Sequence, residues 1–105
     1  THALELLMVG DRINAQEAFR MGLVNQVVPQ AQLMRTAEAL ARRLNRNAPL
    51  SVRAVKEAAY KGSQMTLEQG LRLEALLLEK LQHTEDNREG PRAFVEKRPP
   101  MFKGR

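Results

Sequence analysis

An aromatic ring and an ammonium group lie close together in the terminal segment of the chain, residues 90–105. Phe94 and Lys97 are three residues apart, a spacing that makes two side chains neighbours on a helix. A flat ring stacks on an aromatic base, and an ammonium group neutralises a phosphate. The pair therefore predicts a binding site for a ligand that carries both groups. A solvated basic tail is the alternative that the composition leaves open.

The terminal segment is densely basic, with five Lys or Arg against one Glu. The whole chain has a net charge of +5, and an acidic stretch at residues 64–89 separates this segment from a second basic stretch at residues 31–63. Nucleic-acid-binding proteins more often have one continuous basic face with stacking aromatics, so we favour a local anion site. The alternative is a basic helical nucleic-acid-binding module, with cations at Arg35, Arg42, Arg43, Arg46, Arg53 and Lys56.

No catalytic or metal-binding constellation can be assembled from the sequence by spacing. His2 and His83 are isolated from any partner at metal-ligand spacing, and we expect both on the surface. Ser51 and Ser63 lie at the ends of expected helices, without the context of an activated nucleophile. The chain has no Cys, and its six Gly are scattered rather than gathered in a phosphate-binding loop.

Composition sets further limits. With 105 residues, of which 43% are hydrophobic, the chain can form one small domain. No apolar run approaches the ~20 residues of a membrane span, and the first residues do not look like a secretion signal. The lack of Cys fits a reducing compartment. We expect a cytoplasmic protein without a membrane span.

Helical patterns dominate the first third of the chain. Gly10 closes an apolar helix that lacks a usual N-terminal cap, which suggests an upstream part. Asn14 and Glu17 have the spacing of a capping box, so they predict a short helix that ends at Gly22. The β-branched residues 23–28 predict a short strand or an extended connector.

Four more helices are predicted further along the chain. They cover residues 30–45, 49–61, 67–81 and 91–97. Pro49 and Pro91 each suit the first position of a helix, where the missing N–H costs nothing. Thr66 and Gln69 form a second capping box.

The leucine-rich helix 67–81 is apolar on more than one side. Leu71 and Leu77 share a face, while Leu76 projects nearly opposite. Glu74 falls within the apolar face, either as an edge carboxylate that reaches solvent or an Arg, or as a buried charge at a subunit contact. The excess apolar surface predicts packing against another chain or an upstream part.

Four phrases of the sequence, in order, resemble landmarks of the enoyl-CoA hydratase/isomerase (crotonase) family. They are residues 10–18, 22–28 and 48–56, and the Thr-Glu-Asp, Glu-Gly, Ala-Phe-Val-Glu-Lys-Arg-Pro-Pro and Phe-Lys-Gly-Arg elements of residues 84–105. The resemblance covers essentially the whole chain. It implies a mostly α structure, the helical C-terminal trimerisation region of the α/β crotonase fold, whose N-terminal core of ββα units is absent.

The resemblance also implies a division of roles. Residues 1–30 would be the end of the spiral core, and residues 31–105 the helical region for trimerisation and CoA contacts. In the family, the oxyanion hole and the acid/base carboxylates lie upstream. We therefore expect no catalytic residue and no metal ligand here, and no turnover by this chain alone. Glu17 matches a helix cap after the catalytic segment.

For the full-length parent, the resemblance implies an enoyl-CoA hydratase, with syn addition of water to a 2-enoyl-CoA. An enoyl-CoA isomerase or another acyl-CoA activity is the alternative. Phe94 and Lys97 match the residues that meet the CoA adenine and phosphate ends, in many members from a neighbouring subunit. The implied partners are an acyl-CoA thioester, with CoA as part of the substrate and no separate cofactor, and a homo-oligomer, a trimer or dimer of trimers.

Two departures concern the acyl pocket and the reaction. Gln82 and His83 stand where members often have an aromatic residue, and the chain has no Tyr near its C-terminus. The second departure disfavours the branches that use such a tyrosine in ring-forming chemistry.

Overall fold

The computed structural model describes all of residues 1–105, which form helices and no strand. They make two compact units, Thr1–Glu38 and Ala39–Arg105, and each is described by itself. The helix α3 (Leu33–Leu44) spans the junction in the sequence. The functional division between residues 1–30 and 31–105 stays a prediction.

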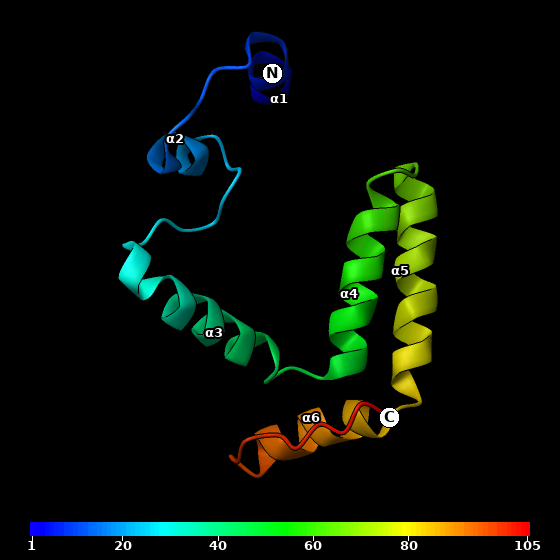
Figure 1. Cartoon of the computed structure of the whole chain (residues 1–105). Helices are drawn as coiled ribbons and strands as arrows, with labels where there is room; N and C mark the ends of the chain where they lie inside the picture. Colours follow the sequence, from blue (N-terminus) through cyan, green and yellow to red (C-terminus); the bar gives the residue numbers. More distant parts are fainter. The chain divides into compact units, whose positions relative to one another are not determined.

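The first unit begins with two short helices (Figure 1). The helix α1 (His2–Val9) ends at Gly10, whose φ of 75° is left-handed. The helix α2 (Ala15–Arg20) begins after Asn14, whose side chain accepts a 2.9 Å hydrogen bond from the N–H of Glu17. The Glu17 carboxylate accepts no hydrogen bond from the backbone N–H of Asn14 and pairs with Arg20 instead. Only half of the predicted capping box therefore forms.

Of the two structures predicted for residues 23–28, the short strand is absent and the connector is present, as an irregular segment. A strand needs a neighbouring strand for its backbone hydrogen bonds, and no other strand exists in this chain. The next predicted helix forms in two pieces, a 3-10 turn at Gln30–Gln32 followed by α3.

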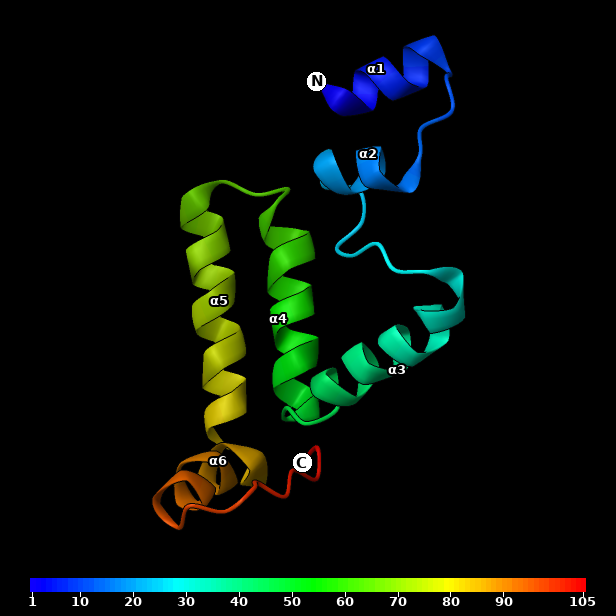
Figure 2. The ribbon, with the colours of Figure 1, turned by 90° about the vertical axis from the view of Figure 1, so that its left-hand side faces the viewer.

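The helices α4 (Pro49–Gly62) and α5 (Leu67–Gln82) lie side by side as an antiparallel hairpin in the second unit (Figures 1 and 2). Pro49 is the first residue of α4, as predicted. The second capping box is also confirmed. Gln69 N donates to Thr66 Oγ1 over 3.3 Å, and Thr66 N donates to Gln69 Oε1 over 3.1 Å.

Few side chains are buried. The buried hydrophobic residues are Ala18, Leu77 and Ala93. Large apolar side chains of α5 stay exposed, among them Leu76 at 56% and Leu78 at 53%. This confirms the predicted excess of apolar surface.

An apolar groove of about 330 Å³ runs between α4 and α5. Its lining residues are Ala54, Val55, Ala58, Ala59, Glu74, Leu77, Leu78 and Leu81. Glu74 is exposed there and makes no ion pair within the chain, while its place at a subunit contact stays a prediction. None of the helices has both the length and the apolar character required to cross a membrane.

The last helix, α6 (Glu85–Val95), differs from its prediction at both ends. It begins after Thr84, whose hydroxyl accepts a 3.1 Å hydrogen bond from Asn87 N. Pro91 lies inside the helix rather than at its first position. Gly90 precedes it, and because glycine has no Cβ it avoids part of the usual clash with a following proline ring. The helix ends at Val95, so the C-terminal tail, residues 96–105, begins before Lys97.

Candidate ligand-contact site in the terminal segment

The end of α6 is a Schellman motif with Lys97 at its left-handed position. Arg98 N donates to Ala93 O over 3.1 Å, and Lys97 N donates to Phe94 O over 3.2 Å. These two bonds satisfy carbonyl groups at the end of the helix. The pattern requires a left-handed conformation at the residue just before Arg98. Lys97 takes that conformation, with φ of 52°.

The end of α2 shows which residue this motif normally contains. Leu23 N donates to Ala18 O over 2.8 Å and Gly22 N donates to Phe19 O over 3.0 Å, in the same pattern. Here glycine, with φ of 79°, takes the left-handed position at no steric cost. Lys97 is the one residue other than glycine with a positive φ in the chain. A left-handed lysine is uncommon, because its side chain carries a steric cost that glycine avoids.

Phe94 and Lys97 are both presented to solvent. The Phe94 side chain is 86% exposed, and Lys97 is exposed as well. The structure brings the two into one turn through the Schellman motif. The helical face from which their proximity was predicted does not extend to Lys97, because α6 ends before it.

Lys97 is also the one cation of the terminal segment that makes no ion pair. Every other Lys or Arg of the segment contacts a carboxylate: Arg92 contacts Glu96, Arg98 contacts Glu89 and Glu96, and Lys103 and Arg105 contact Glu85. The charge of Lys97 is therefore available to an external anion.

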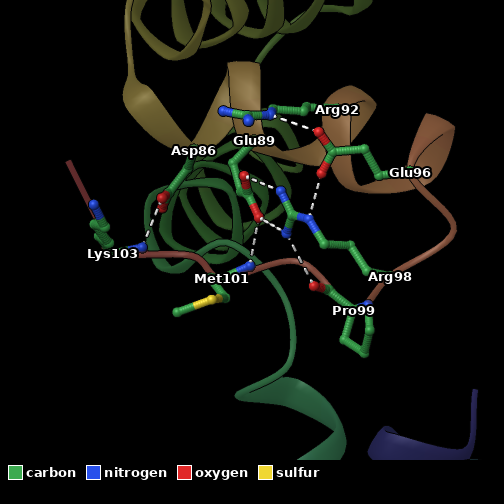
Figure 3. A network of polar contacts seen from close by, with 8 residues as sticks. All are labelled: Asp86, Glu89, Arg92, Glu96, Arg98, Pro99, Met101 and Lys103. Carbon is green, nitrogen blue, oxygen red and sulfur yellow. Dashed lines mark hydrogen bonds and ion pairs between the residues drawn. The ribbon is translucent and has the colours of Figure 1, made fainter.

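A network of charged side chains joins α6 to the residues that follow Lys97 (Figure 3). Arg98 Nη1 donates to Glu89 Oε1 over 2.5 Å, and Arg98 Nη2 donates to Glu89 Oε2 over 3.0 Å. Arg98 Nε donates to Glu96 Oε2 over 2.5 Å, and Met101 N donates to Glu89 Oε1 over 2.8 Å. Only 18% of the Glu89 side chain and 34% of the Arg98 side chain are exposed. We call these residues, Glu89, Glu96, Arg98 and Met101, the Glu89–Arg98 network.

The network keeps its charges over a wide pH range. Hydrogen bonds from Arg98 and then from the Met101 N–H lower the pKa of Glu89 to about 2. The contact with Glu89, followed by that with Glu96, raises the pKa of Arg98 above its ordinary value. The pair therefore stays ionised at neutral pH.

Asp86 attaches the last residues of the tail to the first turn of α6. The buried carboxylate accepts hydrogen bonds from Lys103 N over 2.6 Å and Gly104 N over 2.8 Å. In return, Glu85 N and Asp86 N donate to Arg105 O over 2.8 and 3.3 Å. Gly104 is left-handed, with φ of 74°, and such a turn can direct successive N–H groups at one carboxylate.

The contacts of Asp86 and Glu89 with the tail were not predicted from the sequence. Their spacing of three residues put both carboxylates on one side of a helix, which was the available signal. The N-cap role of Thr84 was also missed, although a Thr before two acidic residues is a usual start of a helix.

The terminal segment presents an exposed aromatic ring beside a cation that makes no ion pair within the chain. No three His, Cys, Asp or Glu side chains come together as a metal-ligand set. Glu17 is engaged with Arg20, whose hydrogen bond lowers the pKa of that carboxyl. The chemistry that this surface supports is the contact of an exposed ring and an unpaired ammonium with an aromatic, phosphorylated ligand.

Comparison with known proteins assigns the chain to a class. The family model described as enoyl-CoA hydratase/isomerase matches residues 1–105. The chain belongs to the enoyl-CoA hydratase/isomerase family.

Individual relatives agree with this assignment. A carnitinyl-CoA dehydratase of Salmonella typhi is 45% identical over 105 residues, covering 96% of this chain and 40% of the relative. The crystal structure of an enoyl-CoA hydratase from Bacillus anthracis is 45% identical, with a TM-score of 0.96 over 99% of this chain and 40% of the other. For an enoyl-CoA hydratase/isomerase from Mycobacterium paratuberculosis, the identity is 40% and the TM-score 0.87, over 90% and 38% of the two chains. The chain thus spans about 40% of the length of the curated relatives it matches.

Proposed function

We propose that this chain is the C-terminal part of a longer acyl-CoA enzyme, whose reaction is the syn addition of water to a 2-enoyl-CoA. Family membership supports an acyl-CoA thioester as the substrate. The names hydratase and dehydratase among the relatives describe the addition and the removal of water. They favour hydration over double-bond isomerisation, which is the runner-up.

Within that enzyme, Phe94 and Lys97 contact the CoA portion of the substrate. The exposed Phe94 ring stacks on the adenine, and the Lys97 ammonium neutralises a phosphate. The observation that carries this proposal is the unpaired, left-handed Lys97 in the same turn as an exposed ring. CoA enters as part of the substrate, without a separate cofactor.

The same enzyme assembles as a homo-oligomer, a trimer or a dimer of trimers, and acts in the cytoplasm. The exposed leucines of α5 and the groove between α4 and α5 support an assembly, because large apolar surfaces usually mark contacts with other chains. In that assembly the CoA-contacting turn serves the substrate of a neighbouring subunit.

An activity assay tests the proposed reaction. The full-length enzyme should hydrate crotonyl-CoA, and this chain alone should show no turnover because the groups that polarise the thioester lie upstream. Hydration of crotonyl-CoA by this chain alone would overturn the proposed division of roles. A full-length enzyme that shifts a double bond without adding water would favour the isomerase.

The family match favours this enzyme over the basic nucleic-acid-binding alternative. A salt-titrated RNA-binding measurement separates the two. The alternative predicts an affinity that falls steeply with salt, and the enzyme predicts little specific binding.

A further inference from the structure

We propose that Glu89 is a positioning residue for Lys97, acting through Arg98 to hold the left-handed turn that presents the ammonium group to the acyl-CoA. This inference rests on the proposed function above. It concerns a residue that does not itself contact the ligand.

The geometry ties the residue after Lys97 to α6 by both its backbone and its side chain. Arg98 N donates to Ala93 O, and the Arg98 guanidinium makes two hydrogen bonds to the carboxylate of Glu89. Such a two-point contact fixes the direction of a guanidinium as well as its distance. The backbone on the C-terminal side of Lys97 is therefore anchored twice.

The tail beyond Arg98 is anchored to the same carboxylate. Glu89 Oε1 accepts from Met101 N over 2.8 Å, so one carboxylate holds the chain on both sides of Pro99 and Pro100. A lysine in the left-handed conformation persists when surrounding contacts over-determine its backbone. Glu89 supplies those contacts from within α6.

The charges of the network also leave Lys97 free for its ligand. Glu96, the sequence neighbour of Lys97, accepts hydrogen bonds from Arg92 over 2.8 Å and from Arg98 over 2.5 Å. Its carboxylate is thus already occupied by two guanidinium groups. Glu89 in turn pairs with Arg98, whose guanidinium would otherwise compete with Lys97 for the phosphate of the ligand. Loss of Glu89 should both loosen the turn and change which cation meets the phosphate.

A double-mutant cycle in the full-length enzyme tests this role, with the KM and kcat for crotonyl-CoA as readouts. Glu89→Gln keeps the shape of the side chain and removes its charge. We expect it to raise KM about fivefold when Lys97 is present and less than twofold in the Lys97→Ala background, with kcat nearly unchanged. A merely structural role predicts equal effects in both backgrounds.

Two further variants complete the design. Arg98→Lys keeps the charge but cannot reproduce the two-point contact, so its KM should lie between those of the unmodified enzyme and Glu89→Gln. It also decides the question if Glu89→Gln does not fold. Glu68→Gln is the matched control, because it removes an exposed contact with Arg72 within a single helix, and KM should not change.

The outcomes separate this inference from the proposed function. If Lys97→Ala raises KM but the effects of Glu89→Gln and Arg98→Lys do not depend on Lys97, the positioning role is wrong and the CoA contact stands. If Lys97→Ala leaves KM unchanged, the proposed CoA contact is wrong and the positioning role falls with it.

Discussion

Lys97 stands where the backbone of this fold would accept glycine. The chain uses Gly22 at the equivalent position after α2, so the same hydrogen-bond pattern occurs with and without a side chain. An L-residue with a side chain pays a steric cost in this conformation that glycine does not. We therefore propose that the lysine is retained for binding rather than for stability.

Replacing Lys97 with Gly should consequently separate stability from binding. We expect Lys97→Gly to raise the free energy of unfolding by up to about 1 kcal/mol, because it removes the left-handed penalty. The same variant should weaken acyl-CoA binding. Denaturant unfolding and calorimetric titration measure the two effects, and Lys97→Ala, which keeps the penalty, is the control. A destabilised Lys97→Gly variant would contradict the interpretation of the turn.

The pH dependence of tail docking should follow Glu89. Its pKa falls from 4.5 to about 2 in the folded chain because of Arg98 and the Met101 N–H. A lowered pKa means that the carboxylate stabilises the fold fully above about pH 4.5, and that this contribution is lost as the pH falls towards 2. The carboxyl ¹³C signal of Glu89 should titrate near pH 2. Titration near pH 4.5 would show that the contact with Arg98 does not form in solution.

The candidate site was partly predictable from residue types. Phe94 and Lys97 could be chosen because a ring and a cation three residues apart are visible in the sequence. The roles of Glu89 and Asp86 could not. Three of their partners, in Met101, Lys103 and Gly104, are backbone N–H groups, which every residue except proline provides, and the pairing of Glu89 with the Arg98 side chain depends on how the tail folds back. Only the folded structure shows from which of these N–H groups each carboxylate accepts a hydrogen bond.

At the scale of elements, α6 and the tail stabilise each other. The first N–H groups of α6 donate to Arg105 O, and the carboxylate of Asp86 accepts from Lys103 N and Gly104 N. Each partner satisfies groups that would otherwise lack a protein partner at a helix start or in a tail. The tail therefore acts as part of the cap of α6.

Asp86→Asn tests this mutual capping. The amide has one oxygen for the two N–H donors, and its NH₂ group faces the second donor. We therefore expect the free energy of unfolding to fall by about 1–3 kcal/mol. Hydrogen exchange at Gly104 should become faster. Glu85→Gln is the control, because its exposed contacts with Lys103 and Arg105 should contribute little. Unchanged exchange at Gly104 in Asp86→Asn would contradict the capping role.

The elements that could be predicted are those decided locally. The cap at Thr66 and the left-handed ends at Gly10 and Gly22 depend on nearby residues alone. Of the two predictions for residues 23–28, the connector is confirmed and the strand was wrong, because strand pairing depends on a partner strand that the chain lacks. The start of α6 was misplaced because Pro91 was taken as its first residue, whereas the helix contains Pro91 in its interior. The true first turn is capped by the tail, which is distant in the sequence.

At the scale of the whole molecule, the chain buries little of its apolar surface. No large side chain is fully buried, while Leu78 and Val55 remain exposed beside the groove between α4 and α5. Leu78→Asp should therefore weaken the proposed oligomer and lower the mass of the full-length enzyme in sedimentation or light scattering. Arg72→Gln, which removes an exposed charge from the same helix, should leave the mass unchanged. An unaltered mass for Leu78→Asp would exclude this face from the assembly.

The proposed role of the terminal segment depends on the contact between Lys97 and the CoA portion of the substrate. Its most direct test is the dissociation constant of CoA, measured by calorimetry with full-length Lys97→Ala and Lys103→Ala enzymes. Lys97 makes no ion pair, whereas Lys103 contacts Glu85 over 3.7 Å. We expect Lys97→Ala to raise the dissociation constant about tenfold, the usual effect of losing a charged hydrogen bond, and Lys103→Ala to change it less than twofold. Equal dissociation constants for Lys97→Ala and the unmodified enzyme would contradict the claim.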